Sequence, residues 1–347
     1  MTAAVPQYDR RLAIAALIAV NALWGTSFPI VRSLNLEMDQ HFQVVTDASS
    51  GWFRAASAGW LIASRFGLAL ALLIFFAHRL CRRVKAPHFW SGVAIGTFFF
   101  AGIVLQVIAL ATIPASRSGF LTSLAVVFTP LLAACLGRKW PRLNVLGAAM
   151  VALLGVAILA GMLRWSEGKP TISDDAMQHW TLGDGLTTLA AILFSIQILL
   201  LDGLGKRYDS AIFTPSMFLT TFVLGCLCFL IAAPRIPENL PETWVGIGLQ
   251  SRYYLLIIWM SVFGTLLAFT WMNKYQPAVS AGQAAVIYTV EPLFASAWAM
   301  FLPGWFSVLC GIAYVDESLT ASMLVGGLFI LLANLLALWP STADQGR

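Results

Sequence analysis

A glutamate followed directly by a proline stands inside an apolar stretch long enough to form a membrane helix, Glu291-Pro292 within Ala281 to Leu302. An ionised glutamate in hydrocarbon costs roughly 3 kcal/mol or more, so such a residue usually faces a polar cavity, a partner or a neutralising proton. Pro292 lacks a backbone N–H and crowds the preceding turn, which predicts a kink and a free carbonyl beside Glu291. Three roles stay open for Glu291: a proton carrier, a ligand of a cationic substrate, or an acceptor for backbone N–H groups that the kink opens.

Polar and aromatic side chains share a face in two further apolar stretches. In the first, Asn21, Trp24 and Ser27 recur every three residues, which places them on one side of a helix. A later stretch carries Phe194 and Gln197 at the same spacing. An aromatic ring beside hydrogen-bonding groups suits a cavity for solutes of mixed polarity, but polar residues also join membrane helices to each other. Cavity lining and helix packing both stay open for this set.

Gln106 and Tyr288 are candidates for hydrogen bonds to a solute, since both side chains can donate and accept. Tyr288 precedes Glu291 by one helical turn. Either side chain could instead satisfy the backbone near Pro130 or Pro292, where we expect helix kinks.

Arg65 lies inside the second apolar stretch. A guanidinium there is costly unless it reaches the membrane surface or pairs with an acid. Arg65 could therefore hold a substrate carboxylate, form an ion pair with Glu291, or anchor its helix at the outer interface.

Motifs for ATP hydrolysis, metalloprotease or serine-hydrolase chemistry do not occur in the sequence, and no residues have metal-ligand spacing. The four histidines lie in loops or at the ends of apolar stretches, and the five cysteines lie mostly within such stretches. This predicts neither a disulfide framework nor a metal site. We expect no cofactor, no metal and no enzymatic activity.

The composition is that of an integral membrane protein. Of 347 residues, 59% are hydrophobic and 11% are charged, with a mean hydropathy of +0.81, whereas about a quarter of the residues of a soluble domain are charged. The net charge of +5 comes from basic residues dispersed between apolar stretches, which is the pattern of membrane topology rather than of nucleic-acid binding.

Apolar stretches of about twenty residues predict ten membrane spans. The ranges are Leu12 to Val31, Ala58 to Leu80, Phe89 to Ile108, Gly119 to Gly137, Leu143 to Leu163, Gly183 to Leu201, Ile212 to Ala233, Tyr254 to Trp271, Ala281 to Leu302 and Ala321 to Trp339. The first is read as a retained helix rather than a signal peptide, because the run is too long and contains Asn21 and Trp24.

The connections between these spans are mostly short, so no soluble catalytic or output domain is expected. The longer ones are an acidic outer loop from Asn35 to Ser57, an outer loop from Arg164 to Leu182, and the stretch from Pro303 to Ser318. The distribution of lysine and arginine places both termini in the cytoplasm.

An internal repeat relates the two halves of the chain. Thr129-Pro130-Leu131 in the fourth span corresponds to Glu291-Pro292-Leu293 in the ninth, at an offset of 292 minus 130, or 162 residues. Because each half holds an odd number of spans, five, the halves must be inverted in the membrane, with a site at their interface near the midplane. The repeats are residues 12–163 and 183–339.

The order and spacing of several motifs resemble the drug/metabolite transporter superfamily, in its EamA-type branch of ten-helix carriers. The matching segments are Leu23-Trp24-Gly25-Thr26-Ser27-Phe28, Arg65-Phe66, Leu105-Gln106, Ala115-Ser116, Gly119-Phe120-Leu121-Thr122, Gly183-Asp184, Ala284-Ala285-Val286-Ile287 and Asp316-Glu317-Ser318-Leu319-Thr320. Two features depart from the pattern: an insertion around Phe301 to Leu309, and a first-half turn, Gly137 to Trp140, without an acid.

The resemblance implies an all-α protein of ten transmembrane helices in two inverted five-helix repeats, located in a prokaryotic inner membrane or an equivalent plasma membrane. It implies a secondary-active exporter of small metabolites, amino-acid-like compounds or drugs, working by alternating access, with protons as a candidate coupling ion. The alternatives are a membrane-embedded scaffold or sensor, and an intramembrane enzyme. The enzyme would need converging acids, but Asp184 and Asp202 lie near opposite ends of one span.

Overall fold

The computed structural model describes residues 10–45, 49–138, 140, 143–160, 162–166, 169–172, 180–205, 207–237, 240, 242–279 and 287–338. The start of the predicted ninth span, residues 281–286, lies outside the described residues.

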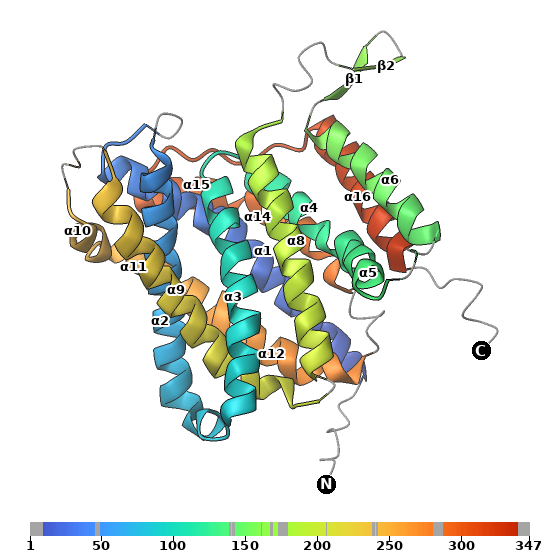
Figure 1. The fold of residues 1–347 in the computed structure, drawn as a ribbon. Coiled ribbons are helices and arrows are strands. Elements are labelled where there is room, and N and C mark those ends of the chain that lie inside the picture. The colour runs from blue at the N-terminus through green and yellow to red at the C-terminus, as the bar shows by residue number, and fades with distance from the viewer. Residues whose placement is uncertain are drawn as a thin grey trace.

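The described chain is helical apart from one small hairpin (Figure 1). The first half comprises α1 (Arg10–His41), α2 (Gly51–Cys81), α3 (Ala86–Ala109), α4 (Ala115–Ser123), α5 (Ala125–Leu136) and α6 (Leu143–Leu159), followed by antiparallel strands β1 (Leu163–Ser166) and β2 (Lys169–Ile172). The second half comprises α8 (Leu182–Gly205), η2 (Ser210–Phe213), α9 (Thr214–Ala232), η3 (Ala233–Arg235), α10 (Trp244–Gly248), α11 (Ser251–Trp259), η4 (Met260–Leu267), α12 (Ala268–Tyr275), η5 (Gln276–Ala278), α14 (Glu291–Ala299), α15 (Leu302–Cys310) and α16 (Ala321–Leu338).

Within the described part of the chain, seven helices or joined helices are long and apolar enough to cross a membrane. The pair α14 and α15 is apolar too, but it bends by 50° at its break, and α6 and α16 are shorter apolar helices. Many large apolar side chains on outer faces are exposed, for example Phe75 and Phe76 on α2 and Leu153 on α6. In water such a surface would aggregate. The chain is a multi-pass membrane protein.

The predicted acidic loop from Asn35 to Ser57 is wrong at both ends, because α1 continues to His41 and α2 begins at Gly51. The reason is an apolar stripe: Leu34, Met38 and Phe42, spaced by four residues, are fully or almost fully buried. A window set to the thickness of the hydrocarbon stops at Val31 and misses this extension.

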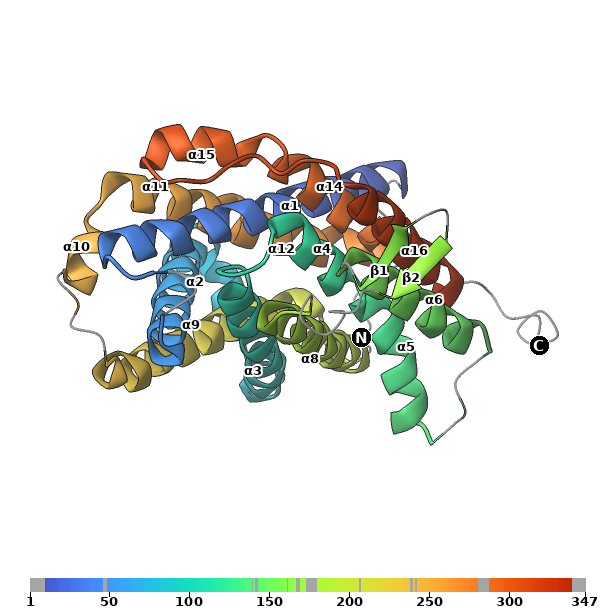
Figure 2. The same cartoon turned by 90° about the horizontal axis from the view of Figure 1, so that it is seen from above.

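The predicted ninth span is also divided differently. Helix α14 begins at Glu291, so Pro292 occupies its first turn, where a missing N–H costs nothing. The predicted insertion, 301–309, falls almost entirely within α15, a helix that lies along α1 in Figures 1 and 2. In the fourth span, α5 runs through Pro130, and the interruption lies earlier, at Leu124.

Helix pairs from the two halves of the chain form the body of the molecule. Helix α2 packs along α9, and α6 packs along α16 at one end of the body (Figure 2). Helix α3 contacts α8 and α9, while α1 contacts α14 and α12, and α4 contacts α14 and α8. Glycines permit the closest approaches: a Cβ added at Gly155 would lie 2.8 Å from the carbonyl oxygen of Gly326.

Candidate functional site

Aromatic rings from α1, α12 and the segment before α14 meet around Trp24. Its ring centroid lies 5.6 Å from that of Phe269 and 6.0 Å from that of Tyr288. Trp24 and Tyr288 are partly buried. The Tyr288 hydroxyl donates to Oε1 of Gln276 at 3.0 Å, so it serves a side chain rather than the backbone near Pro292. Trp24 and Tyr288 are candidates from the sequence, and the structure adds Phe269 and Gln276 beside them.

Glu291 opens α14, one turn after Tyr288. A short turn at Thr289 and Val290 separates the two residues. Its carboxylate thus lies at a helix N-terminus, where backbone N–H groups without partners favour negative charge. Among the described residues the carboxylate makes no hydrogen bond and no ion pair. Within the described chain, Glu291 therefore accepts no hydrogen bond from a backbone N–H group.

Arg65 is held by an unusual helix. Its Nε donates to Oγ1 of Thr265 at 2.7 Å, and its Nη2 donates to the carbonyl oxygen of Gly264 at 3.2 Å. Both acceptors belong to η4, a π-helix, and such segments are frequent at functional sites. Arg65 is 4% exposed, and within the described chain it has no acidic partner, Glu291 included.

The guanidinium of Arg65 keeps donors to spare. Arginine has five N–H donors, and the two bonds to η4 use only two of them. Beside it, the Oγ of Ser27 is buried without a hydrogen-bond partner among the described residues. A Cβ added at Gly264 would lie 3.0 Å from this oxygen and 3.6 Å from Nη2 of Arg65. The missing side chain of Gly264 therefore leaves room between the unpaired Ser27 hydroxyl and the Arg65 guanidinium.

A chain of rings connects Trp24 to Phe194. Phe269, next to Trp24, contacts Phe99 at 5.6 Å between centroids, and Phe99 contacts Phe194 at 5.9 Å. Phe194 also packs against Gly102, where an added Cβ would lie 2.6 Å from its ring. The two aromatic residues that the sequence pattern relates to each other thus stand at the two ends of one aromatic chain.

Gln106 and Gln197 lie on α3 and α8. Gln106 donates from Nε2 to Oγ1 of Thr122 at 2.8 Å, which ties α3 to α4. Gln197 is buried in α8, and among the described residues its amide makes no hydrogen bond. The hydrogen bond of Gln106 joins two helices, whereas the side-chain amide of Gln197 remains available for a hydrogen bond.

Two acidic motifs of the sequence have structural partners. Asp184 forms an ion pair with Arg117, 2.6 Å between Nε and Oδ1, which ties the start of α8 to α4. Glu317 accepts hydrogen bonds at the start of α4 from the Ala115 N–H, at 2.6 Å, and from the N–H and hydroxyl of Ser116. Both acids thus fix the first turn of α4, and Asp184 also joins it to the start of α8. Within the described ranges no cluster of three possible metal ligands occurs.

Comparison with known proteins gives a relative in sequence and a similar fold. No family model matches the chain. An uncharacterized transporter of Archaeoglobus fulgidus is 23% identical over 325 residues, which cover 94% of this chain and 83% of that protein. A solved crystal structure, described only as that of a protein, matches 95% of this chain and 97% of its own, with a TM-score of 0.51 and 17% identity. The latter similarity concerns the fold alone.

Proposed function

We propose that the chain is a secondary-active transporter that exports small metabolites, amino-acid-like compounds or drugs by alternating access. The observation that carries this proposal is the set of polar groups with unused hydrogen-bonding capacity, Arg65, Ser27 and Glu291, inside a multi-span apolar body next to the Trp24 rings. Buried polar groups in a membrane are costly and mark solute or ion pathways. The similarity to an uncharacterized transporter along most of the chain adds support.

We propose further that the body is built from two inverted five-helix repeats, residues 12–163 and 183–339, giving ten spans with both termini in the cytoplasm. The packing of the helices supports this proposal, because a contact between a helix of one half and a helix of the other has a counterpart when each helix is replaced by its equivalent in the other half. The second helix of the first half, α2, packs against the second helix of the second half, α9. The fifth helices of the two halves, α6 and α16, pack against each other in the same way. The first helix of the first half, α1, packs on the fourth span of the second half, α14. Equivalently, the first helix of the second half, α8, packs on the fourth span of the first half, α4 and α5. This is the arrangement expected for an EamA-type carrier of an inner or plasma membrane.

In this proposal the substrate contacts Trp24, Ser27, Arg65, Phe194, Tyr288 and Glu291, and also Gln106 of the first half and Gln197 of the second half. Arg65 provides a cation for a substrate carboxylate, because its guanidinium is pre-oriented by η4 and keeps free donors. The aromatic chain provides apolar contact area. Glu291 binds a cationic group or carries a proton that couples transport to a gradient.

The test is solute flux in proteoliposomes with an imposed pH gradient, with a panel of amino acids and cationic dyes, for wild type and Glu291→Gln. We expect the gradient to drive wild-type flux, while the folded variant retains only exchange that does not depend on the gradient. A variant that responds fully to the gradient would show that Glu291 is structural. Matching unfolding midpoints for the two proteins serve as the control for folding.

A further inference from the structure

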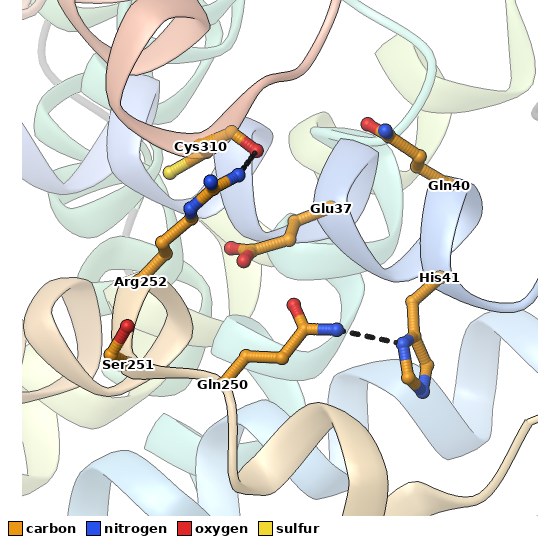
Figure 3. Close-up of a pocket in the computed structure, with 7 residues that line it drawn as sticks. All are labelled: Glu37, Gln40, His41, Gln250, Ser251, Arg252 and Cys310. Atoms are coloured by element: carbon orange, nitrogen blue, oxygen red, sulfur yellow. Dashed lines mark hydrogen bonds between the residues drawn. The ribbon is translucent and has the colours of Figure 1, made fainter.

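A polar pocket lies where α1, α11 and α15 come together (Figure 3). Its volume is about 390 Å³, within the range of small-molecule sites. The lining residues are Glu37, Gln40, His41, Gln250, Ser251, Arg252 and Cys310. The proposed transport site contains none of them.

The pocket contains a buried acid whose charge is not balanced by a contact. Glu37 is 4% exposed, and both of its carboxylate oxygens are buried without a hydrogen-bond partner in the described part of the chain. Two residues further along the same helix, Asp39 forms a bidentate pair with Arg54, at 2.6 and 3.0 Å. An unpaired buried carboxylate costs several kcal/mol, so Glu37 is the group in this pocket that most needs a cation.

Two hydrogen bonds of His41 orient the Gln250 side chain so that its carbonyl oxygen faces the pocket. Nε2 of His41 bonds the carbonyl oxygen of Thr243 at 3.2 Å, and Nδ1 of His41 bonds Nε2 of Gln250 at 2.9 Å. A carbonyl can only accept and an amide nitrogen can only donate, so in this arrangement Nε2 of His41 donates to Thr243 and Nδ1 accepts from Gln250. The Oε1 of Gln250 is left as an acceptor on the same side as Glu37 in Figure 3.

A positively charged residue, Arg252, lies at the solvent-exposed edge of the pocket. Arg252 is exposed and uses Nη1 to donate to the carbonyl oxygen of Cys310 at 2.9 Å. Figure 3 shows the Arg252 side chain facing the carboxylate of Glu37 across the pocket, and among the described residues the two form no ion pair. An anionic group that enters from solvent can reach the remaining guanidinium donors of Arg252. A cationic group can reach the floor of the pocket, formed by the Glu37 carboxylate and Oε1 of Gln250.

We propose that this pocket binds a zwitterionic solute of the α-amino acid type. The ammonium group is held by Glu37 and by Oε1 of Gln250, and the carboxylate by Arg252. An ammonium supplies three donors to the acceptors on the floor, and a carboxylate matches the fork of the guanidinium. The inference concerns binding alone and does not depend on transport.

The test is equilibrium binding to the full chain in detergent or nanodiscs, measured by calorimetry with three probes. L-leucine carries both charges, L-leucinamide carries only the ammonium, and N-acetyl-L-leucine carries only the carboxylate. We expect L-leucine to bind the wild type best, L-leucinamide more weakly and N-acetyl-L-leucine weakest. Glu37→Gln lowers the affinity for L-leucine by about tenfold or more, since it removes a charge-assisted contact in a buried site. Arg252→Gln lowers the affinity for L-leucine and leaves that for L-leucinamide unchanged.

Asp39→Asn is the matched control on the same helix. It breaks a buried ion pair, so it lowers the unfolding midpoint while it leaves L-leucine binding unchanged, whereas Glu37→Gln leaves the midpoint equal or higher. Equal affinity of wild type and Glu37→Gln for L-leucine overturns the proposal. The absence of saturable L-leucine binding by the wild type also overturns it, as does a preference for L-leucinamide over L-leucine.

Discussion

The anchoring of Arg65 by the π-helix can be measured through Thr265→Val. Valine has nearly the shape of threonine and is also branched at Cβ, so the change removes one hydroxyl and leaves no cavity. The lost contact is the 2.7 Å bond from Nε of Arg65, and both side chains are buried, Thr265 at 0% exposure. A buried hydrogen bond to a charged group contributes about 1.5–3 kcal/mol. Because the bond from Nη2 to Gly264 remains, we expect a loss of about 2 kcal/mol in the free energy of unfolding.

Thr221→Val is the matched control. Thr221 is also fully buried, but its hydroxyl donates to the carbonyl oxygen of Met217 in its own helix, at 2.9 Å, and this carbonyl keeps its helical partner. The expected loss is below about 1 kcal/mol. The assay is reversible unfolding in bicelles by steric trapping, with both variants compared to wild type. Equal losses for the two variants would refute the inference that Thr265 positions Arg65.

Two further predictions concern the central site and a helix end. Gly264→Ala adds a Cβ that would lie 3.0 Å from Oγ of Ser27; we expect the KM for any carboxylate-bearing solute in the flux assay to rise about tenfold. Gly248→Ala, whose Cβ would meet a ring of Trp60 at 3.1 Å, should leave that KM unchanged, and a rise in both variants would indicate a general packing effect. Glu317→Gln weakens the cap of α4 and should lower the free energy of unfolding by about 1–2 kcal/mol, without changing substrate affinity; an unchanged stability would contradict the capping role.

The membrane character could be predicted from the sequence because hydropathy acts locally, and most helices lie close to their predicted ranges. The tail of α1 could not be predicted in this way, since what extends it beyond Val31 is burial of Leu34, Met38 and Phe42 against other helices. A search for apolar residues four apart, rather than for continuous apolar runs, is the signal that would have found it.

The surroundings of the candidate residues depended on contacts between distant parts of the chain. The sequence singled out Arg65 and Trp24, but their partners Thr265 and Phe269 lie 200 residues or more away. Nothing in the local pattern of Met260 to Leu267 distinguishes a π-helix from an α-helix. Glu37 was missed because it was assigned to a loop, whereas the structure buries it in α1.

The most direct test of the central claim is to follow one radiolabelled solute across sealed proteoliposomes and to identify it chemically on the far side. The proposed function predicts saturable flux of an unaltered compound from the panel that empty liposomes do not show. No flux of any compound under an imposed gradient would favour a membrane scaffold or sensor. A chemically altered product would show an intramembrane enzyme and contradict the account.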